Sequence, residues 1–163
     1  MKTKKLTVMA LTTALAMILS FVESQIPAFV AVPGVKMGLA NIAVVFALYK
    51  LGWKEAVAVS LVRVVLVSML FGSIASLFYS LAGAVLSLAG MGLLKKSGRF
   101  TEIVVSVAGG ILHNIGQIAM ASIILETDAL RYYLPFLLLS GIVAGVVIGV
   151  VSAVMVRRIQ IRL

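Results

Sequence analysis

Four polar side chains with the chemistry to bind a ligand lie inside stretches that are otherwise apolar. Arg63 stands near the middle of one apolar stretch, and His113, Asn114 and Gln117 stand in the middle of another. Spacings of three and four residues place the last three on one broad face of a helix. A guanidinium with neutral polar groups suits an anionic or strongly polar ligand, whereas a single histidine with no carboxylate at a suitable spacing argues against a metal site.

Each of these polar groups also has a structural interpretation. Arg63 could be an internal tie to Glu23 or to helix-end carbonyls, and Asn, Gln and His commonly hydrogen-bond one membrane helix to another. A charge at the bilayer midplane costs at least ~2.5–3.5 kcal/mol, so Arg63 must face the bundle or a water-filled cavity in either case. Because the helical cluster and Arg63 lie at similar depth, we interpret them together as a ligand site.

The segment 33–41 places Lys36, two glycines and Asn41 where long apolar helices would otherwise run unbroken. Backbone interrupted by Gly and Pro at membrane depth must be buried in protein or line a cavity, since lipid cannot satisfy its polar groups. We expect this segment to form the floor or lid of the ligand site, with Lys36 and Asn41 as candidate ligand contacts. Glu23 is a further candidate through pairing with Lys36 or Arg63.

Composition sets the surroundings of these residues. The 163-residue chain is 63% hydrophobic and only 12% charged, whereas about a quarter of a soluble domain is charged. The net charge of +9 comes from short basic clusters between apolar runs, which is the positive-inside pattern of a membrane protein and does not indicate a nucleic-acid partner. The chain has no cysteine, so disulfides and thiol chemistry are excluded.

We predict an all-α integral membrane protein, a single domain over residues 1–163 that forms a bundle of six transmembrane helices. The expected helices cover residues 6–22, 38–49, 55–71, 74–94, 101–125 and 134–156. Eleven of the 14 Lys and Arg residues fall in the segments that this arrangement places on one side, which predicts a multi-pass protein of the prokaryotic cell membrane with both termini in the cytoplasm. The helix over 38–49 rises only ~20 Å of a ~30 Å bilayer core, as in transporters that bind ligand at a broken helix.

Small residues recur at helical spacing on two of the expected helices. Ala10 and Ala14 lie four residues apart on the first helix, and Gly141, Gly145 and Gly149 follow the same spacing on the last. Such patterns usually mark close helix packing within a membrane protein. Docking of a partner is the alternative interpretation for the alanine pair.

The chain is similar to the substrate-binding S component of an energy-coupling factor (ECF) transporter in its six helices, its alanine pair and its long first outer loop. More closely, GVKMGLAN at 34–41, LFGS at 70–73 and HNIGQ at 113–117 resemble the Gx transporter family, also called heptaprenyl diphosphate synthase component I. The resemblance covers essentially the whole chain. It implies a ligand in the outer half beneath the first loop, and contact of Ala10 and Ala14 with a membrane coupling subunit driven by two ATPase subunits. The chain has no phosphate-binding loop of its own.

Two functions follow as hypotheses. The first is a binding subunit for uptake of a small anionic or polar-headed molecule, such as an isoprenoid or quinone precursor, with no cofactor. Its expected ligand-binding residues are Lys36, Asn41, Arg63, His113, Asn114, Gln117 and Glu23. The second is a non-catalytic membrane anchor for a prenyl diphosphate synthase.

Catalysis by the chain itself does not fit its acidic residues. Prenyl diphosphate synthesis needs clustered aspartates to hold Mg²⁺ on a diphosphate, and Asp128 is the single aspartate of the chain. A membrane enzyme that uses His113 as an acid or base would lack a paired carboxylate or nucleophile. We therefore expect no catalytic residues and no metal site.

Overall fold

The structure, a computed structural model, describes residues 2–25, 38–127 and 129–160, and these residues form helices and no strand. The elements are α1 (Lys2–Gln25), α2 (Asn41–Lys50), α3 (Trp53–Phe71), α4 (Ile74–Ser97), α5 (Glu102–Ile124), the 3₁₀ helix η1 (Ala129–Tyr133) and α6 (Leu134–Arg158). The helical fold class predicted from the sequence is therefore confirmed.

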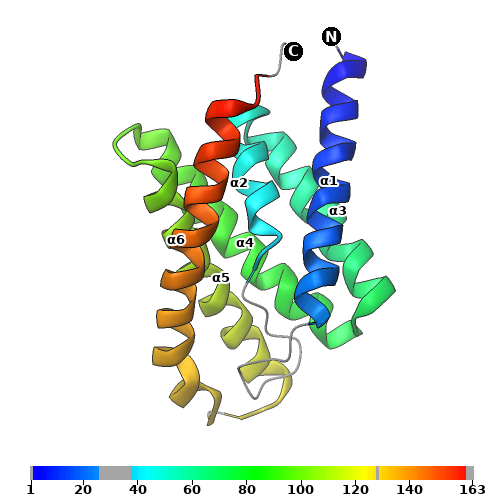
Figure 1. Cartoon of the computed structure of the whole chain (residues 1–163). Helices are drawn as coiled ribbons and strands as arrows, with labels where there is room; N and C mark the ends of the chain where they lie inside the picture. The colour runs from blue at the N-terminus through cyan, green and yellow to red at the C-terminus, as the bar shows by residue number, and fades with distance from the viewer. Residues whose placement is uncertain (1, 26–37, 128, 161–163) are drawn as a thin grey trace.

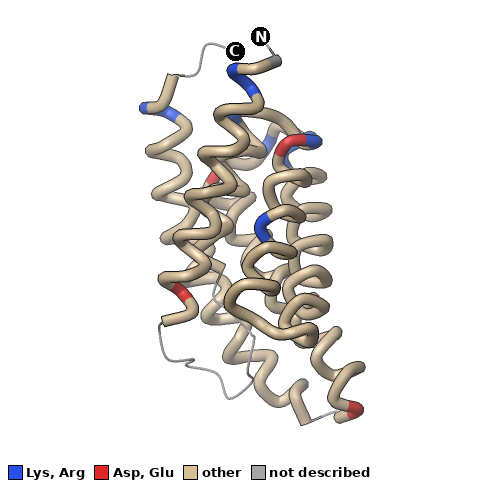
Figure 2. Tube along the Cα trace, turned by 90° about the vertical axis from the view of Figure 1, so that its right-hand side faces the viewer, with Lys and Arg blue, Asp and Glu red and all other residues tan. Residues whose placement is uncertain are grey.

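The helices form one bundle in which α5 lies between α4 and α6 and shares its largest interfaces with these two helices (Figure 1). On the other side, α1 packs against α3 and α2. The start of α1 and the end of α6 lie at the same end of the bundle (Figure 1). Lys and Arg residues gather at that end in Figure 2.

The short helix α2 lies in the middle of the bundle. Every residue from Asn41 to Leu48 is buried, although its ten residues rise only ~15 Å, half the thickness of a bilayer core. The last carbonyls of a helix need partners from outside the helix. Lys95 of α4 supplies one, because its Nζ donates to the Leu48 carbonyl oxygen and lies 5.0 Å from the centre of the Tyr49 ring.

The predicted start of the second helix at residue 38 is wrong. Gly38 has φ +93°, which lies outside the right-handed helical region, and its carbonyl accepts the Asn41 N–H at 2.8 Å in a turn. The helix therefore begins only at Asn41. The observed helix begins three residues later than predicted, because residues 38–40 belong to the turn that precedes it.

Other helix ends also differ from the prediction by a few residues. The first helix extends beyond 6–22 in both directions, since the Lys, Glu and Gln residues at its ends are good helix formers. The third begins at Trp53, directly after Gly52 with φ +122°. The fourth continues to Ser97 because its left-handed cap is Gly98.

The two last helices show small differences of the same kind. The fifth helix excludes Thr101, whose side chain instead caps it by accepting the Val104 N–H at 3.4 Å. The sixth runs on to Arg158. The turn of 3₁₀ helix before it was not predicted.

Glycines allow α5 to approach both of its neighbours closely. A Cβ on Gly116 would lie 2.6 Å from the Ala82 carbonyl oxygen of α4, and a Cβ on Gly110 would lie 2.6 Å from the Gly141 carbonyl oxygen of α6. Added atoms on Gly145 and Gly149 would likewise meet the α5 backbone. The glycine stripe of α6 is thus a packing surface, as predicted.

Within the part of the chain that the structure describes, four helices are long and apolar enough to cross a membrane: α1 from Thr3, α4, α5 and α6. The helix α2 is too short, and α3 carries Lys54, Glu55 and Arg63 within its 19 residues. Together with the composition, these helices indicate a membrane protein. The six-span arrangement and the cytoplasmic termini remain predictions.

Substituting Gly116 with valine should destabilise the bundle, because the added atoms would meet the backbone of Ala82 and Gly83. Overpacking of this kind costs about 1–3 kcal/mol, which corresponds to roughly 2–10 °C in the unfolding midpoint. Thermal unfolding in detergent, followed by the fluorescence of the single tryptophan Trp53, measures the change. Ala119→Val, at an exposed position of the same helix, is the control, and equal losses in both variants would contradict the close-packing argument.

The orientation can be measured because the chain contains no cysteine. Ser97→Cys and Tyr132→Cys place single exposed thiols at opposite ends of the bundle. With cytoplasmic termini, a membrane-impermeant maleimide should label Tyr132→Cys in intact cells and Ser97→Cys only after permeabilisation. Labelling of Ser97→Cys in intact cells would reverse the predicted orientation.

Candidate functional site

Arg63 is buried halfway along α3, with 5% of its surface exposed. Its Nε and Nη2 atoms have no hydrogen-bond partner among the described residues. The guanidinium interacts electrostatically with the Glu23 carboxylate and with the His113 imidazole. Burying an arginine with two nitrogens that lack hydrogen-bond partners costs folding free energy. An oxyanion that accepts hydrogen bonds from both N–H groups at once would stabilise this arrangement.

His113 and Gln117 come from α5 and lie against Gly83 of α4. A Cβ on Gly83 would be 2.9 Å from His113 Nδ1 and 3.0 Å from Gln117 Cγ, so only glycine leaves space for both side chains. Both side chains are buried, Gln117 completely. Both amide atoms of Gln117 have no hydrogen-bond partner in the described part of the chain, and His113 Nδ1 lies beside the Gly83 backbone without a hydrogen bond of full geometry.

These three residues, Arg63, His113 and Gln117, form what we call the polar cluster. Each leaves at least one buried donor or acceptor unpaired, and each such group costs about 1–3 kcal/mol when it stays unsatisfied. Arg63 offers donors only, while the Gln117 amide offers both a donor and an acceptor. The cluster therefore suits a group that carries negative charge together with a hydrogen-bonding oxygen or nitrogen.

The start of α2 meets the polar cluster at Gly38. A Cβ built on this residue would lie 2.9 Å from Asn41 Nδ2 and 3.9 Å from His113 Cδ2. Asn41 is itself buried as the first residue of α2. Asn41 thus lies close to His113 through Gly38, and its role as a ligand contact stays a prediction.

Glu23 holds this segment in place. Its Oε1 accepts the Gly38 N–H at 2.5 Å and its Oε2 accepts the Leu39 N–H at 3.1 Å. The carboxylate thereby joins the end of α1 to the residues that precede α2. Glu23 therefore accepts hydrogen bonds from the backbone and also acts electrostatically on Arg63. It positions the segment before α2 in addition to any pairing with a basic side chain.

Asn114 faces away from His113 and Gln117. Its Nδ2 donates to the Leu137 carbonyl oxygen of α6 at 2.6 Å, and a Cβ on Gly141 would lie 2.8 Å from the same Nδ2. The amide nitrogen therefore joins α5 to α6. This agrees with the alternative that Asn114 hydrogen-bonds one helix to another. Its Oδ1 is buried without a hydrogen-bond partner among the described residues.

Three further candidates are Lys36, Ala10 and Ala14. Lys36 lies outside the described residues. Ala10 and Ala14 are exposed on α1, where a partner can reach them, so docking there stays a prediction. Ser76 of α4, which was not among the sequence candidates above, also has a buried hydroxyl with no hydrogen-bond partner among the described residues.

The fold and this site define a class: a helical membrane protein with a buried, cationic and hydrogen-bonding cluster inside the bundle. A sequence model of the family described as heptaprenyl diphosphate synthase component I matches residues 12–155. The chain belongs to this family, which confirms the resemblance seen in its motifs. No curated protein and no solved structure matches the chain.

Replacing Glu23 with glutamine should loosen the segment before α2, because an amide has one acceptor oxygen where the carboxylate has two. Hydrogen bonds to charged groups contribute about 1.5–3 kcal/mol, so exchange of the Gly38 and Leu39 amides should accelerate by roughly 10–100-fold. Hydrogen exchange with mass spectrometry measures this rate. Glu126→Gln, at an exposed position, should leave it unchanged; unaltered protection in Glu23→Gln would show that Glu23 does not hold the segment.

Proposed function

We propose that this protein is a non-catalytic membrane subunit that binds a small molecule with an anionic or strongly polar head in the polar cluster. One observation carries the proposal: Arg63, His113 and Gln117 are each buried, Arg63 lies within electrostatic range of His113, and all three leave polar atoms without a well-formed hydrogen bond to the described residues. A purely structural network would be expected to satisfy its own members. A ligand that supplies the missing acceptors explains the arrangement.

In the first version of this function, the protein takes up its ligand as an S-component-like subunit of an ECF-type transporter. The ligand would enter near the segment before α2, and the bundle would then rearrange against a membrane coupling subunit and its ATPases. The exposed alanine pair Ala10 and Ala14 is the proposed contact for that coupling subunit. The ligand contacts would be Arg63, His113, Gln117 and Asn41, with Glu23 positioning and with Lys36 and Asn114 as further candidates.

The second version is an accessory subunit that anchors a prenyl diphosphate synthase to the membrane, and the family description favours it over transport. Its partner would be the catalytic subunit of the synthase, docked on the basic end of the bundle. Here the polar cluster would hold the diphosphate or another polar end of an isoprenoid. Both versions share a ligand with a polar head and differ in the protein partner.

Ligand binding by the cluster is tested by native mass spectrometry of the protein purified in mild detergent. An anionic small molecule should accompany the wild type and Arg99→Gln, an exposed control, and should be absent from Arg63→Gln. Loss of a buried charge partner costs about 2–5 kcal/mol of binding, so its affinity should fall at least about 30-fold.

The thermal stability of the Arg63→Gln variant distinguishes a ligand-binding role of Arg63 from a purely structural one. If Arg63 serves a ligand, Arg63→Gln should retain or raise the thermal stability of the empty protein, since it removes a poorly paired buried charge. A structural tie predicts a clear loss of stability instead. Retention of the anionic molecule by Arg63→Gln would overturn the proposed site.

The two versions are separated by their partners. An accessory subunit should retain a soluble prenyl synthase during mild purification, and Lys96→Glu combined with Arg99→Glu at the basic end should release it. A transport subunit should retain membrane and ATPase subunits, and the same substitutions should leave the bound small molecule in place.

A further inference from the structure

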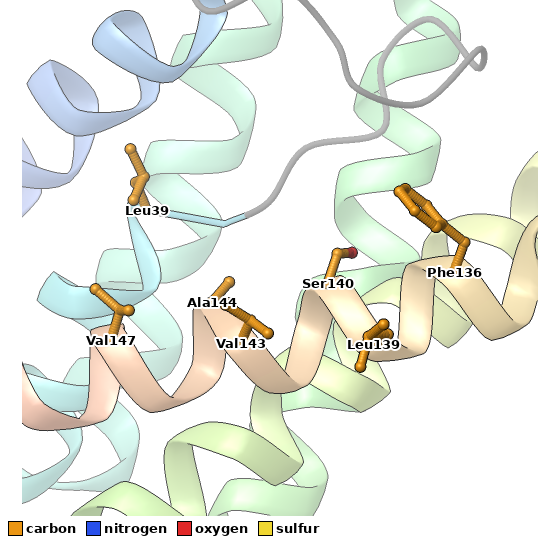
Figure 3. A pocket seen from close by; sticks show the side chains of 7 residues that line it. All are labelled: Leu39, Phe136, Leu139, Ser140, Val143, Ala144 and Val147. Atoms are coloured by element: carbon orange, nitrogen blue, oxygen red, sulfur yellow. The ribbon is translucent and has the colours of Figure 1, made fainter.

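An apolar groove of about 400 Å³ runs along the first half of α6. It is lined by Leu39, Phe136, Leu139, Ser140, Val143, Ala144 and Val147. Figure 3 shows these side chains along α6, with Leu39 reaching over from the segment before α2. The volume lies in the range of small-molecule pockets, and the stretch of helix from Phe136 to Val147 is ~16 Å long.

The groove and the polar cluster share a wall at residues 38 and 39. Leu39 lines the groove, while its N–H donates to Glu23. Gly38, its neighbour in the chain, lies against Asn41 and near His113. Consecutive residues therefore border the polar cluster and the groove.

A second connection runs through the Leu137 carbonyl oxygen. This oxygen accepts a hydrogen bond from the hydroxyl of Ser140, a groove residue, at 2.9 Å. It also accepts one from the side-chain amide of Asn114 of α5, at 2.6 Å. Asn114 follows His113 directly and keeps an unpaired Oδ1. The groove thus adjoins the helix that carries the cluster at two separate points.

We propose that the ligand is an amphiphile, with an oxyanion head such as a phosphate on the polar cluster and a hydrocarbon chain in the groove along α6. This inference rests on the proposed function and adds the chemical class of the ligand. Ser140 is the one polar side chain among the lining residues, and its hydroxyl is already bonded within the helix. The groove offers hydrocarbon contacts alone, whereas the cluster offers polar contacts to the other end of the same molecule.

The test uses an alkyl phosphate that carries a photoreactive diazirine at the end of its chain. Irradiation of the detergent-solubilised wild type should attach the probe to peptides from residues 136–147. Val143→Trp, which fills the groove, should reduce this labelling about tenfold through steric exclusion. Val150→Trp is the matched control on the same helix, because Val150 is similarly exposed (46% against 59% for Val143) but does not line the groove.

An ordinary membrane lipid in the groove would behave differently. Labelling by the alkyl phosphate should disappear in Arg63→Gln, while labelling by a phosphatidylcholine with the same diazirine should not change. If both probes label the groove equally in Arg63→Gln, the groove is a lipid contact and the inference is wrong. Labelling confined to other helices overturns it as well.

Failure of this inference is distinguishable from failure of the proposed function. Native mass spectrometry with a short alkyl phosphate, which has a head and almost no chain, reports on the polar cluster alone. If this probe binds the wild type and not Arg63→Gln, but Val143→Trp does not affect the long probe, only the assignment of the chain to the groove fails. If the short probe does not bind at all, the cluster itself is not an oxyanion site.

Discussion

The arrangement of polar residues in this bundle depends on one constraint, the burial of the charged Arg63 side chain among apolar helices. A midplane charge costs several kcal/mol unless the protein supplies counter-charge and hydrogen bonds. The bundle provides the electrostatic influence of Glu23 and no described hydrogen-bond partner for Nε or Nη2 of Arg63. These unpaired nitrogens are the basis of the proposed ligand site, to which α5 contributes His113 and Gln117.

Close helix packing makes the position of those side chains definite. Glycines of α5 meet the backbone of α4 on one side and of α6 on the other, so α5 has little freedom to rotate or slide. Asn114 adds a direct hydrogen bond to α6. His113 and Gln117 are thereby held toward α4 and the start of α2, while Glu23 fixes the segment before α2 from the side of α1.

The sequence was informative wherever polarity or helix-breaking residues interrupt apolar runs. Arg63, His113 and Gln117 were found because they lie in the middle of apolar stretches, and the break at 33–41 was found from its glycines and proline. The direction of each side chain was not predictable: Asn114 follows His113 by one residue, yet its amide faces α6. The Glu23 contact to backbone and the groove on α6 depend on how distant segments pack, which spacing along one helix does not encode.

The family description and the polar cluster together limit what the protein does. A component of a prenyl synthase need not carry a buried cationic site, and a transporter subunit need not belong to a family with that description. A subunit that holds the polar end of an isoprenoid-like molecule satisfies both, because such a molecule requires charged contacts at one end and hydrocarbon contacts along the other. The buried cluster and the apolar groove that adjoins it provide these two surfaces within one bundle.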